Sequence, residues 1–214
     1  MPVNYYSILK NGTGFSKNRV MAIDLETLVS DSSGFLTNER IIAASISYFD
    51  REKGNIETAV FVADSDSEID EKKLISDIDR KIKEIDPEII IGYNHTGYDI
   101  PLLQMKMRTF SRGERPRNLL YYLGTSWCLD MMYVIAEDLW KADGDYFIRK
   151  LDDVVLHERY SGLQLMRKKD LVRMDGINKG EAVKKLWKEN RVSFIEYCEG
   201  DTHDILMIFK EIFG

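Results

Sequence analysis

The sequence predicts an α/β protein in which a mixed central sheet is flanked by helices. Three apolar runs rich in β-forming residues come first, separated by turn-forming residues, and this pattern favours three antiparallel strands. Helical periodicity then alternates with short buried strands, and the chain ends in helices. This order is typical of a sheet whose later strands are parallel, with helices packed on its faces.

The length suits one domain. The chain has 214 residues, of which 44% are hydrophobic, enough for one sizeable core. We expect an irregular lead-in over residues 1–19, where glycines and polar residues are frequent, and a single domain over residues 20–214.

The first three expected strands lie in the N-terminal third of the chain. Residues 20–25 form a short apolar run, and a turn-rich loop follows at 30–38. Residues 41–49 and 56–62 are the second and third strands, and the segment Asp50–Asn55 between them has the composition of a hairpin turn.

The clearest helix is expected at residues 68–85, where apolar side chains recur at helical spacing and Pro87 follows. Ser193 is the expected N-cap of the last helix, with Glu196 at its third position. The other expected elements are strands at 88–91 and 126–129 and helices at 101–108, 131–140, 150–157, 179–189 and 193–213.

Charge and cysteine content bear on the possible binding partners and on the cellular location. A net charge of -6 opposes nucleic-acid binding only if the acids are spread evenly, because the distribution of charge matters more than the total. The two cysteines show no metal-ligand spacing, so a reducing cytoplasm is the expected location. We find no signal-peptide pattern and no apolar run long enough for a membrane, and the oligomeric state stays open.

Three acidic segments carry the candidate chemistry. Asp24 and Glu26 lie two residues apart at the end of an apolar strand, so they share one face of it. Asp99 lies between a buried strand and a helix, and Tyr197 and Asp201 lie four apart on a predicted helix. If the fold gathers these acids, each pair repels by roughly 3 kcal/mol at ~5 Å and an effective dielectric of ~20. Hard divalent cations with oxygen ligands would offset this repulsion.

Each segment alone also has an ordinary interpretation. Asp24 and Glu26 fit an acid pair that faces solvent, Asp99 fits a helix cap, and Tyr197 fits a core residue beside an exposed Asp201. The three segments together, in this order, favour a two-metal phosphodiesterase site.

Three motifs carry a family resemblance: Ala22-Ile-Asp-Leu-Glu-Thr27, Ile91-Gly-Tyr-Asn-His-Thr-Gly-Tyr-Asp-Ile-Pro-Leu-Leu103 and Tyr197-Cys-Glu-Gly-Asp-Thr-His-Asp-Ile-Leu206. They resemble the DEDD superfamily of 3′–5′ exonucleases, which have a ribonuclease-H-like fold. Within it the chain is most similar to the tyrosine (DEDDy) branch, especially the proofreading exonuclease domain of archaeal family B DNA polymerases. The resemblance covers roughly residues 18–214, and both a stand-alone enzyme and an excised polymerase domain fit it.

The resemblance implies a site and a reaction. Two Mg²⁺ or Mn²⁺ ions are expected, held by Asp24, Glu26, Asp99 and Asp201. Tyr197 is expected to position the attacking water, and the pocket for the terminal nucleotide is expected to include Thr27, Asn94 and Tyr98. The implied products are nucleoside 5′-monophosphates.

A basic stretch follows the second motif. It contains Lys106, Arg108, Arg112, Arg115 and Arg117 against one acid, Glu114. We expect Arg108, Arg112 and Arg115 to bind phosphates of single-stranded DNA, with RNA as an alternative, and His95 is a further candidate phosphate contact. Two other functions remain open: an exonuclease of RNA or short oligonucleotides, and a non-catalytic module of this fold that binds nucleic acid or a polymerase.

Overall fold

The computed structural model describes residues 19–29, 39–144, 150–166 and 179–214. The expected lead-in therefore lies outside the described residues except for Arg19, as does the expected loop at 30–38. Within the described ranges, no helix combines the length and the apolar character needed to span a bilayer.

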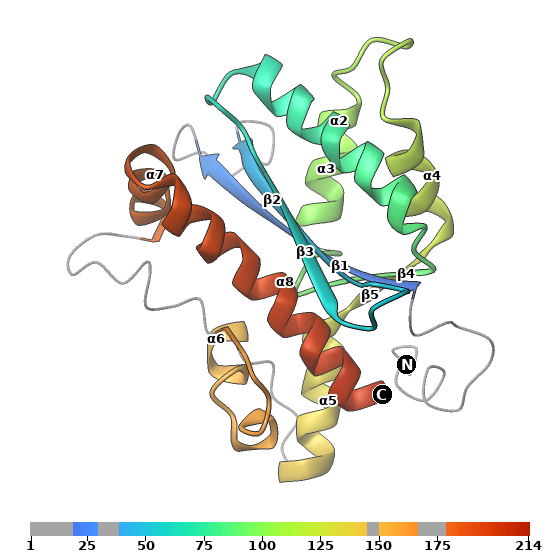
Figure 1. Ribbon diagram of the computed structural model, residues 1–214, viewed down its shortest axis with the longest axis vertical. Helices are drawn as coiled ribbons and strands as arrows, with labels where there is room; N and C mark the ends of the chain where they lie inside the picture. The colour runs from blue at the N-terminus through green and yellow to red at the C-terminus, as the bar shows by residue number, and fades with distance from the viewer. Residues whose placement is uncertain (1–18, 30–38, 145–149, 167–178) are drawn as a thin grey trace.

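A five-stranded mixed sheet forms the centre of the molecule (Figure 1). Its strands are β1 (Val20–Val29), β2 (Glu39–Phe49), β3 (Ile56–Val62), β4 (Ile89–Gly92) and β5 (Trp127–Asp130). In space their order is β3-β2-β1-β4-β5. The first three pair antiparallel, and β4 and β5 continue the sheet parallel to β1, which confirms the predicted architecture.

Helices cover both faces of the sheet (Figure 1). One face packs against α2 (Glu68–Ile85), α3 (Asp99–Met107) and α4 (Arg117–Thr125). The other packs against α5 (Met131–Asp143), α6 (Leu151–Val154), α7 (Lys179–Glu189) and α8 (Arg191–Phe213).

Alternation along β1 decides which side chains meet α8. Met21 and Ile23 belong to the apolar cluster on the α2 side, whereas Val20 and Ala22 belong to the cluster on the α8 side. Because successive side chains of a strand point to opposite faces, Asp24 and Glu26 continue the row of Val20 and Ala22. Both acids therefore point to the face that α8 covers.

Helix α2, which the spacing of apolar residues predicted most clearly, has the predicted bounds, and its apolar side chains are buried except for Ile69, which is exposed. Ser67 caps it by accepting a hydrogen bond from the amide of Asp70, and the left-handed Asp86 closes it through its N–H to the carbonyl of Ile82.

Two helix predictions need correction, and one helix was missed. Helix α8 begins at Arg191, because the side chain of Asn190 accepts the hydrogen bond from the amide of Ser193, so Ser193 is not the N-cap. The helix predicted at 150–157 is only one turn long. Helix α4 was not predicted, and Leu119 is its one fully buried side chain.

The junction of α7 and α8 is attached to the end of β3, which is an edge strand of the sheet. The indole N–H of Trp187 donates to the carbonyl of Ala63 at 3.2 Å. The guanidinium of Arg191 donates to the carbonyls of Val62 and Ala63, both at 2.9 Å. These bonds occupy main-chain acceptors where β3 ends.

A buried ion pair joins α3 to α2. Lys106 and Glu71 are 5% and 3% exposed, and their charged atoms lie 3.0 Å apart. Glu71 also accepts from Arg40 at 2.6 Å and from the amide of Ile41 at 2.9 Å. The ammonium of Lys106 also donates to the carbonyl of Glu39. Lys106 is therefore a structural residue, and the expectation that it could contact phosphates with the rest of the basic stretch was wrong.

Removing one partner of this pair should be costly. We expect Glu71→Ala to lower the free energy of unfolding by about 3–5 kcal/mol, because the buried ammonium of Lys106 is left unpaired. Urea unfolding measures the change. The matched control is Glu68→Ala, which breaks an exposed pair with Lys72 on the same helix and should cost about 0–1 kcal/mol. Equal losses in the two variants would contradict a structural role for the buried pair.

Candidate metal centre and nucleic-acid site

Three of the predicted acids meet between β1 and α8. Asp24 and Glu26 reach this place from β1, and Asp201 reaches it from the facing side of α8. One carboxylate oxygen from each lies within 4.8 Å of the others, and all three residues are partly buried. Chain segments that lie far apart in the sequence therefore supply one acidic group.

The donor set fits a hard divalent cation. All three side chains offer carboxylate oxygens, the ligands that Mg²⁺ and Mn²⁺ prefer over nitrogen or sulfur. Partial burial strengthens the mutual repulsion of the three carboxylates, and a cation would offset it. The group is therefore a candidate divalent-metal centre.

The fourth acid, Asp99, lies beside this group and is not part of it. It is 4% exposed at the start of α3, and its Oδ1 accepts a hydrogen bond from the amide of Leu25 at 3.0 Å. Burial raises the pKa of Asp99 to about 7, and the carboxylates of Glu26 and Asp130 add to the shift, while the Leu25 amide opposes it. A nearby cation would favour the ionised form. The bond to Leu25 ties Asp99 to the strand that carries Asp24 and Glu26.

Tyr197 lies one turn before Asp201 on α8. Its side chain is 2% exposed and belongs to an apolar cluster that includes Leu28 and Ala43. The ring stacks on Phe194, with 6.4 Å between the ring centroids. In this structure the phenol is thus a core side chain next to the acidic group.

Two of the three residues expected to line the nucleotide pocket share a buried partner. The hydroxyls of Thr27 and Tyr98 lie 3.0 Å apart, and both donate to the carboxylate of Glu39. Burial raises the pKa of Tyr98, so its hydroxyl stays protonated and able to donate. The role of Glu39 could not be predicted from the sequence, because an acid at the first position of a strand normally faces solvent. The third residue, Asn94, is exposed and has a left-handed backbone with φ of 59°.

Asp130 organises the loop that leads to Asp99. One of its oxygens accepts from the amide of Asn94 at 2.8 Å and from that of Met132 at 3.1 Å. The other accepts from the hydroxyl of Thr96 at 2.6 Å and from its amide at 3.3 Å. Sequence reasoning missed this function, and the available signal was an Asp between a strand and a helix, which favours an N-cap.

His95 belongs to this loop and its side chain is fully buried, so the interpretation of His95 as a phosphate contact was wrong. Burial lowers the pKa of His95, which keeps the ring neutral at pH 7. Gly92 makes room for it, because a Cβ there would lie 2.6 Å from the Cβ of His95 and 2.8 Å from the carbonyl oxygen of Ile23.

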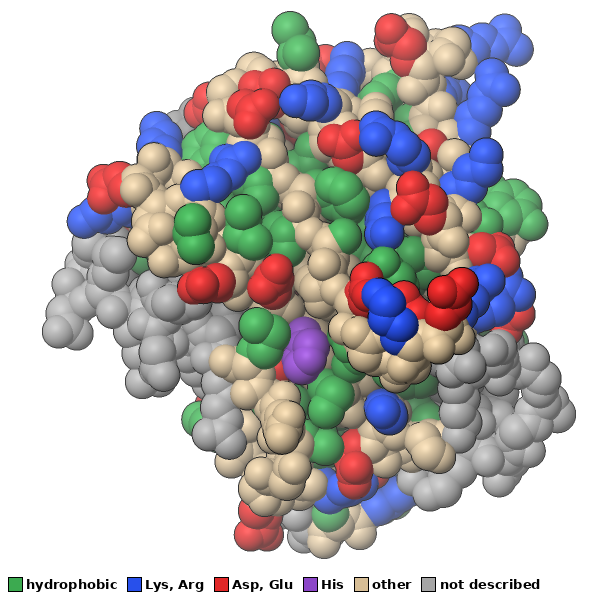
Figure 2. Space-filling model, viewed as in Figure 1, with side chains coloured by type: hydrophobic (Ala, Val, Ile, Leu, Met, Phe, Trp, Pro, Cys, Tyr) green, Lys and Arg blue, Asp and Glu red, His purple; other side chains and the backbone are tan. Residues whose placement is uncertain are grey.

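The arginines of the basic stretch lie in another part of the molecule. Arg108, Arg112 and Arg115 are exposed between α3 and α4, and they form no ion pair with a described residue. Figure 2 shows blue side chains at the upper right, where Figure 1 places this segment. Helix α3 separates the segment from Asp99, and its nine residues span about 13 Å. Arg108 therefore lies one helix length from Asp99, and Arg112 and Arg115 follow it on the segment that leads to α4.

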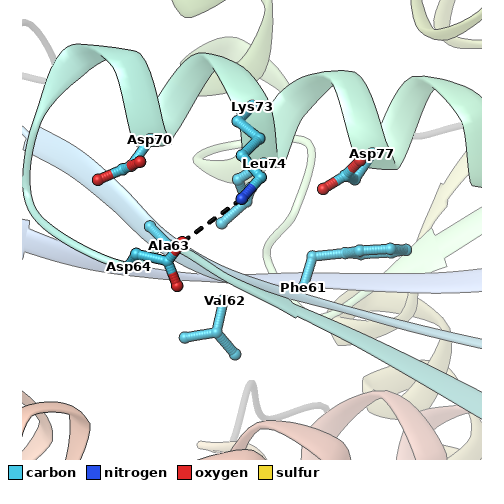
Figure 3. A pocket seen from close by; sticks show the side chains of 8 residues that line it. All are labelled: Phe61, Val62, Ala63, Asp64, Asp70, Lys73, Leu74 and Asp77. Carbon is cyan, nitrogen blue, oxygen red and sulfur yellow. Dashed lines mark hydrogen bonds and ion pairs between the residues drawn. The ribbon is translucent and has the colours of Figure 1, made fainter.

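A small pocket lies away from the acidic group. It has a volume of about 70 Å³ and lies between β3 and α2. Figure 3 shows three of its acids, Asp64, Asp70 and Asp77, around Lys73, whose ammonium lies 3.4 Å from Asp64. None of the predicted site residues lines this pocket.

Removing the Asp130 carboxylate should loosen the loop. We expect Asp130→Ala to lower the free energy of unfolding by about 2–4 kcal/mol, because several donors lose their acceptor and α5 loses its cap. Hydrogen exchange should accelerate at the amides of Asn94 and Thr96. The control is Ser67→Ala, which removes the cap of α2 and the bond of its hydroxyl to the Asp70 carboxylate, both outside this loop. Unchanged exchange at those two amides in Asp130→Ala would contradict the role of Asp130.

Comparisons with known proteins identify the family. The family model for the exonuclease domain of DNA polymerase family B matches residues 4–117, just over half of the chain. A curated DNA polymerase of Archaeoglobus fulgidus is 32% identical over 89 residues, which cover 40% of this chain and 11% of that protein. The chain thus spans about a tenth of that relative's length.

The fold comparison agrees. The structure of the family B DNA polymerase from the hyperthermophilic archaeon Pyrobaculum calidifontis matches 94% of this chain and 25% of that chain. The TM-score is 0.62 at 20% sequence identity, which shows a shared fold. By its sequence motifs, its mixed sheet and the family match, the chain belongs to the exonuclease domain family of family B DNA polymerases, a family of 3′–5′ exonucleases.

Proposed function

We propose that this protein is a metal-dependent exonuclease that releases nucleoside 5′-monophosphates from the 3′ ends of single-stranded DNA. The observation that carries the proposal is the meeting of carboxylates from β1 and α8 within 4.8 Å. We further propose that residues 20–214 act as a single exonuclease domain. DNA is preferred over RNA because the relatives that match are DNA polymerases.

The acids would hold two divalent ions. Asp24, Glu26 and Asp201 would bind one ion, and Asp24 and Asp99 would bind the other, with Asp99 acting directly or through water. Such ions supply Lewis-acid stabilisation of the phosphate and lower the pKa of the attacking water. The buried bond from the Leu25 amide would hold Asp99 at its end of the site.

Tyr197 would orient the attacking water. Its position one turn from Asp201 supports this role. A phenol has a reference pKa of about 10, so Tyr197 is a poor base at neutral pH and would act through a hydrogen bond. The terminal nucleotide would lie against Thr27, Asn94 and Tyr98, of which Asn94 is the most exposed.

The exposed arginines would bind the strand behind its 3′ end. Arg108 lies about one α3 length from Asp99, which suits a phosphate a few nucleotides upstream of the reacting one. Their charges also explain how a protein with a net charge of -6 attracts a polyanion, because the acids and the arginines lie in different places.

The acidic group is tested by isosteric substitutions. We expect Asp24→Asn and Asp201→Asn each to slow Mg²⁺-dependent mononucleotide release by about 10²–10³-fold or more, as when a preorganised electrostatic group is lost. The assay follows 5′-labelled and 3′-labelled single-stranded DNA and RNA with Mg²⁺, Mn²⁺ or chelator. It therefore reports the direction of degradation, the preference for DNA or RNA and the metal dependence together.

The control for this assay is Asp66→Asn, which removes an exposed carboxylate outside the site. Wild-type rates in Asp24→Asn or Asp201→Asn would refute the assignment of these acids. A wild-type protein that binds single-stranded DNA and releases no mononucleotide with any metal would instead support the non-catalytic module.

The basic stretch is tested by the salt dependence of binding. We expect the double variant Arg112→Gln/Arg115→Gln to reduce the slope of log Kd against log salt by about 1.4, since each phosphate contact on a single strand contributes ~0.7. The charge-matched control is Lys83→Gln/Lys188→Gln, which changes two exposed lysines on α2 and α7. Equal slopes for the two double variants would show that the arginines make no specific phosphate contact.

A further inference from the structure

A row of four hydroxyls joins the sheet to α8 directly behind the acidic group. The hydroxyl of Thr202 on α8 lies 2.7 Å from that of Ser45 and 2.9 Å from that of Ser47, both on β2. Ser47 in turn lies 2.8 Å from the hydroxyl of Thr58 on β3. The exposed fractions of Ser45, Ser47 and Thr202 are 1%, 0% and 0%. We call Ser45, Ser47, Thr58 and Thr202 the hydroxyl row.

The hydroxyl row adjoins the candidate ligands on both of its sides. Thr202 directly follows Asp201 on α8. Ser45 is the cross-strand partner of Asp24, and such partners have Cβ atoms about 4.5–5.5 Å apart on the same face of the sheet. The contact between Thr202 and Ser45 therefore links the backbone positions that carry Asp201 and Asp24.

Apart from the bonds of Arg191 to the end of β3, the side chains of α8 that pack on the sheet beside the hydroxyl row are mainly apolar. Phe194, Cys198 and Ile205 pack on the sheet, and such packing is non-directional. Hydrogen bonds between hydroxyls require about 2.5–3.0 Å and good alignment. A shift of α8 by one residue moves its side chains by about 1.5 Å along the axis and turns them by roughly 100°, which would break the two bonds of Thr202 to β2 and leave only its bond to the carbonyl of Glu199 within the helix. The hydroxyl row thus selects one position of α8 on the sheet.

We propose that Thr202, through Ser45 and Ser47, is a positioning residue that holds the Asp201 carboxylate in register with those of Asp24 and Glu26. This inference rests on the proposed metal centre. The hydroxyl row contacts no ion itself and acts through the backbone of the ligands, as outer groups of metal sites commonly do.

The test compares three variants. Thr202→Val keeps the shape and removes the hydroxyl, and it should weaken Mn²⁺ binding about tenfold or more. Thr202→Ser restores the hydroxyl and should restore the affinity. Ser45→Ala/Thr202→Val removes both partners, so stability should largely recover because no buried hydroxyl is left without a partner, while the affinity stays low. Calorimetric titration with Mn²⁺ in the absence of nucleic acid gives the affinities, and urea unfolding gives the stabilities.

The control variant is Ile208→Val, which removes one buried methylene from the same helix and leaves the hydroxyl row intact. It should lower stability and leave the Mn²⁺ affinity unchanged. An affinity that follows stability across all four variants would overturn the positioning role, since the hydroxyl row would then only stabilise the fold.

Crystal structures of the wild type and of Thr202→Val separate this inference from the proposed function. Wild-type protein that binds no Mn²⁺ would overturn the metal centre, and the crystal structures would then decide on the hydroxyl row. An unchanged separation of the Asp24 and Asp201 carboxylates in Thr202→Val would overturn the inference, whereas a displaced Asp201 would support it.

Discussion

Electrostatic repulsion among Asp24, Glu26 and Asp201 is the constraint that organises this protein. Their carboxylates lie within 4.8 Å of one another, and each pair opposes the fold by roughly 3 kcal/mol at ~5 Å and an effective dielectric of ~20. Side chains on a loose scaffold would move apart. The acids are instead carried by the central strand of the sheet and by the longest helix in the described residues, which share a continuous apolar core.

The same constraint accounts for the polar groups around the acids. The amide of Leu25 donates a hydrogen bond to Asp99, and the carboxylate of Asp130 accepts hydrogen bonds from the loop that precedes Asp99. The carboxylate of Glu39 accepts from the hydroxyls of Thr27 and Tyr98. Each of these bonds is directional, whereas the apolar core is not. Packing therefore decides that the sheet and its helices associate, and the buried polar groups decide at which register they do so.

The sequence was informative where the signal is local. The spacing of apolar residues at 68–85 predicted a helix with the observed bounds, and the order of strands and helices predicted the mixed sheet. Helix α4 was not predicted, because it is only nine residues long and Leu119 is the one side chain that it buries completely.

The candidate site also contains residues that could be predicted from local sequence and residues that could not. Its acids could be identified because each lies in a recognisable motif, and the structure brings three of them together. The residues that position the acids could not be predicted from the sequence. Asp130 accepts hydrogen bonds from a loop 36 residues away, and Thr202 bonds to a serine 157 residues away. Contacts between such distant positions depend on the folded chain and leave no periodic pattern. The burial of Lys106 could not be predicted for the same reason, because its partner Glu71 lies on another helix.

The attachment of α7 and α8 to β3 has a consequence for behaviour in concentrated solution. An edge strand offers unpaired main-chain groups to any other strand, and this is a common route to aggregation. Trp187 and Arg191 occupy the carbonyls at the end of β3, so an incoming strand would find those acceptors already taken. The helical junction that leads to the candidate metal ligands thus also blocks one end of this edge strand to an incoming strand.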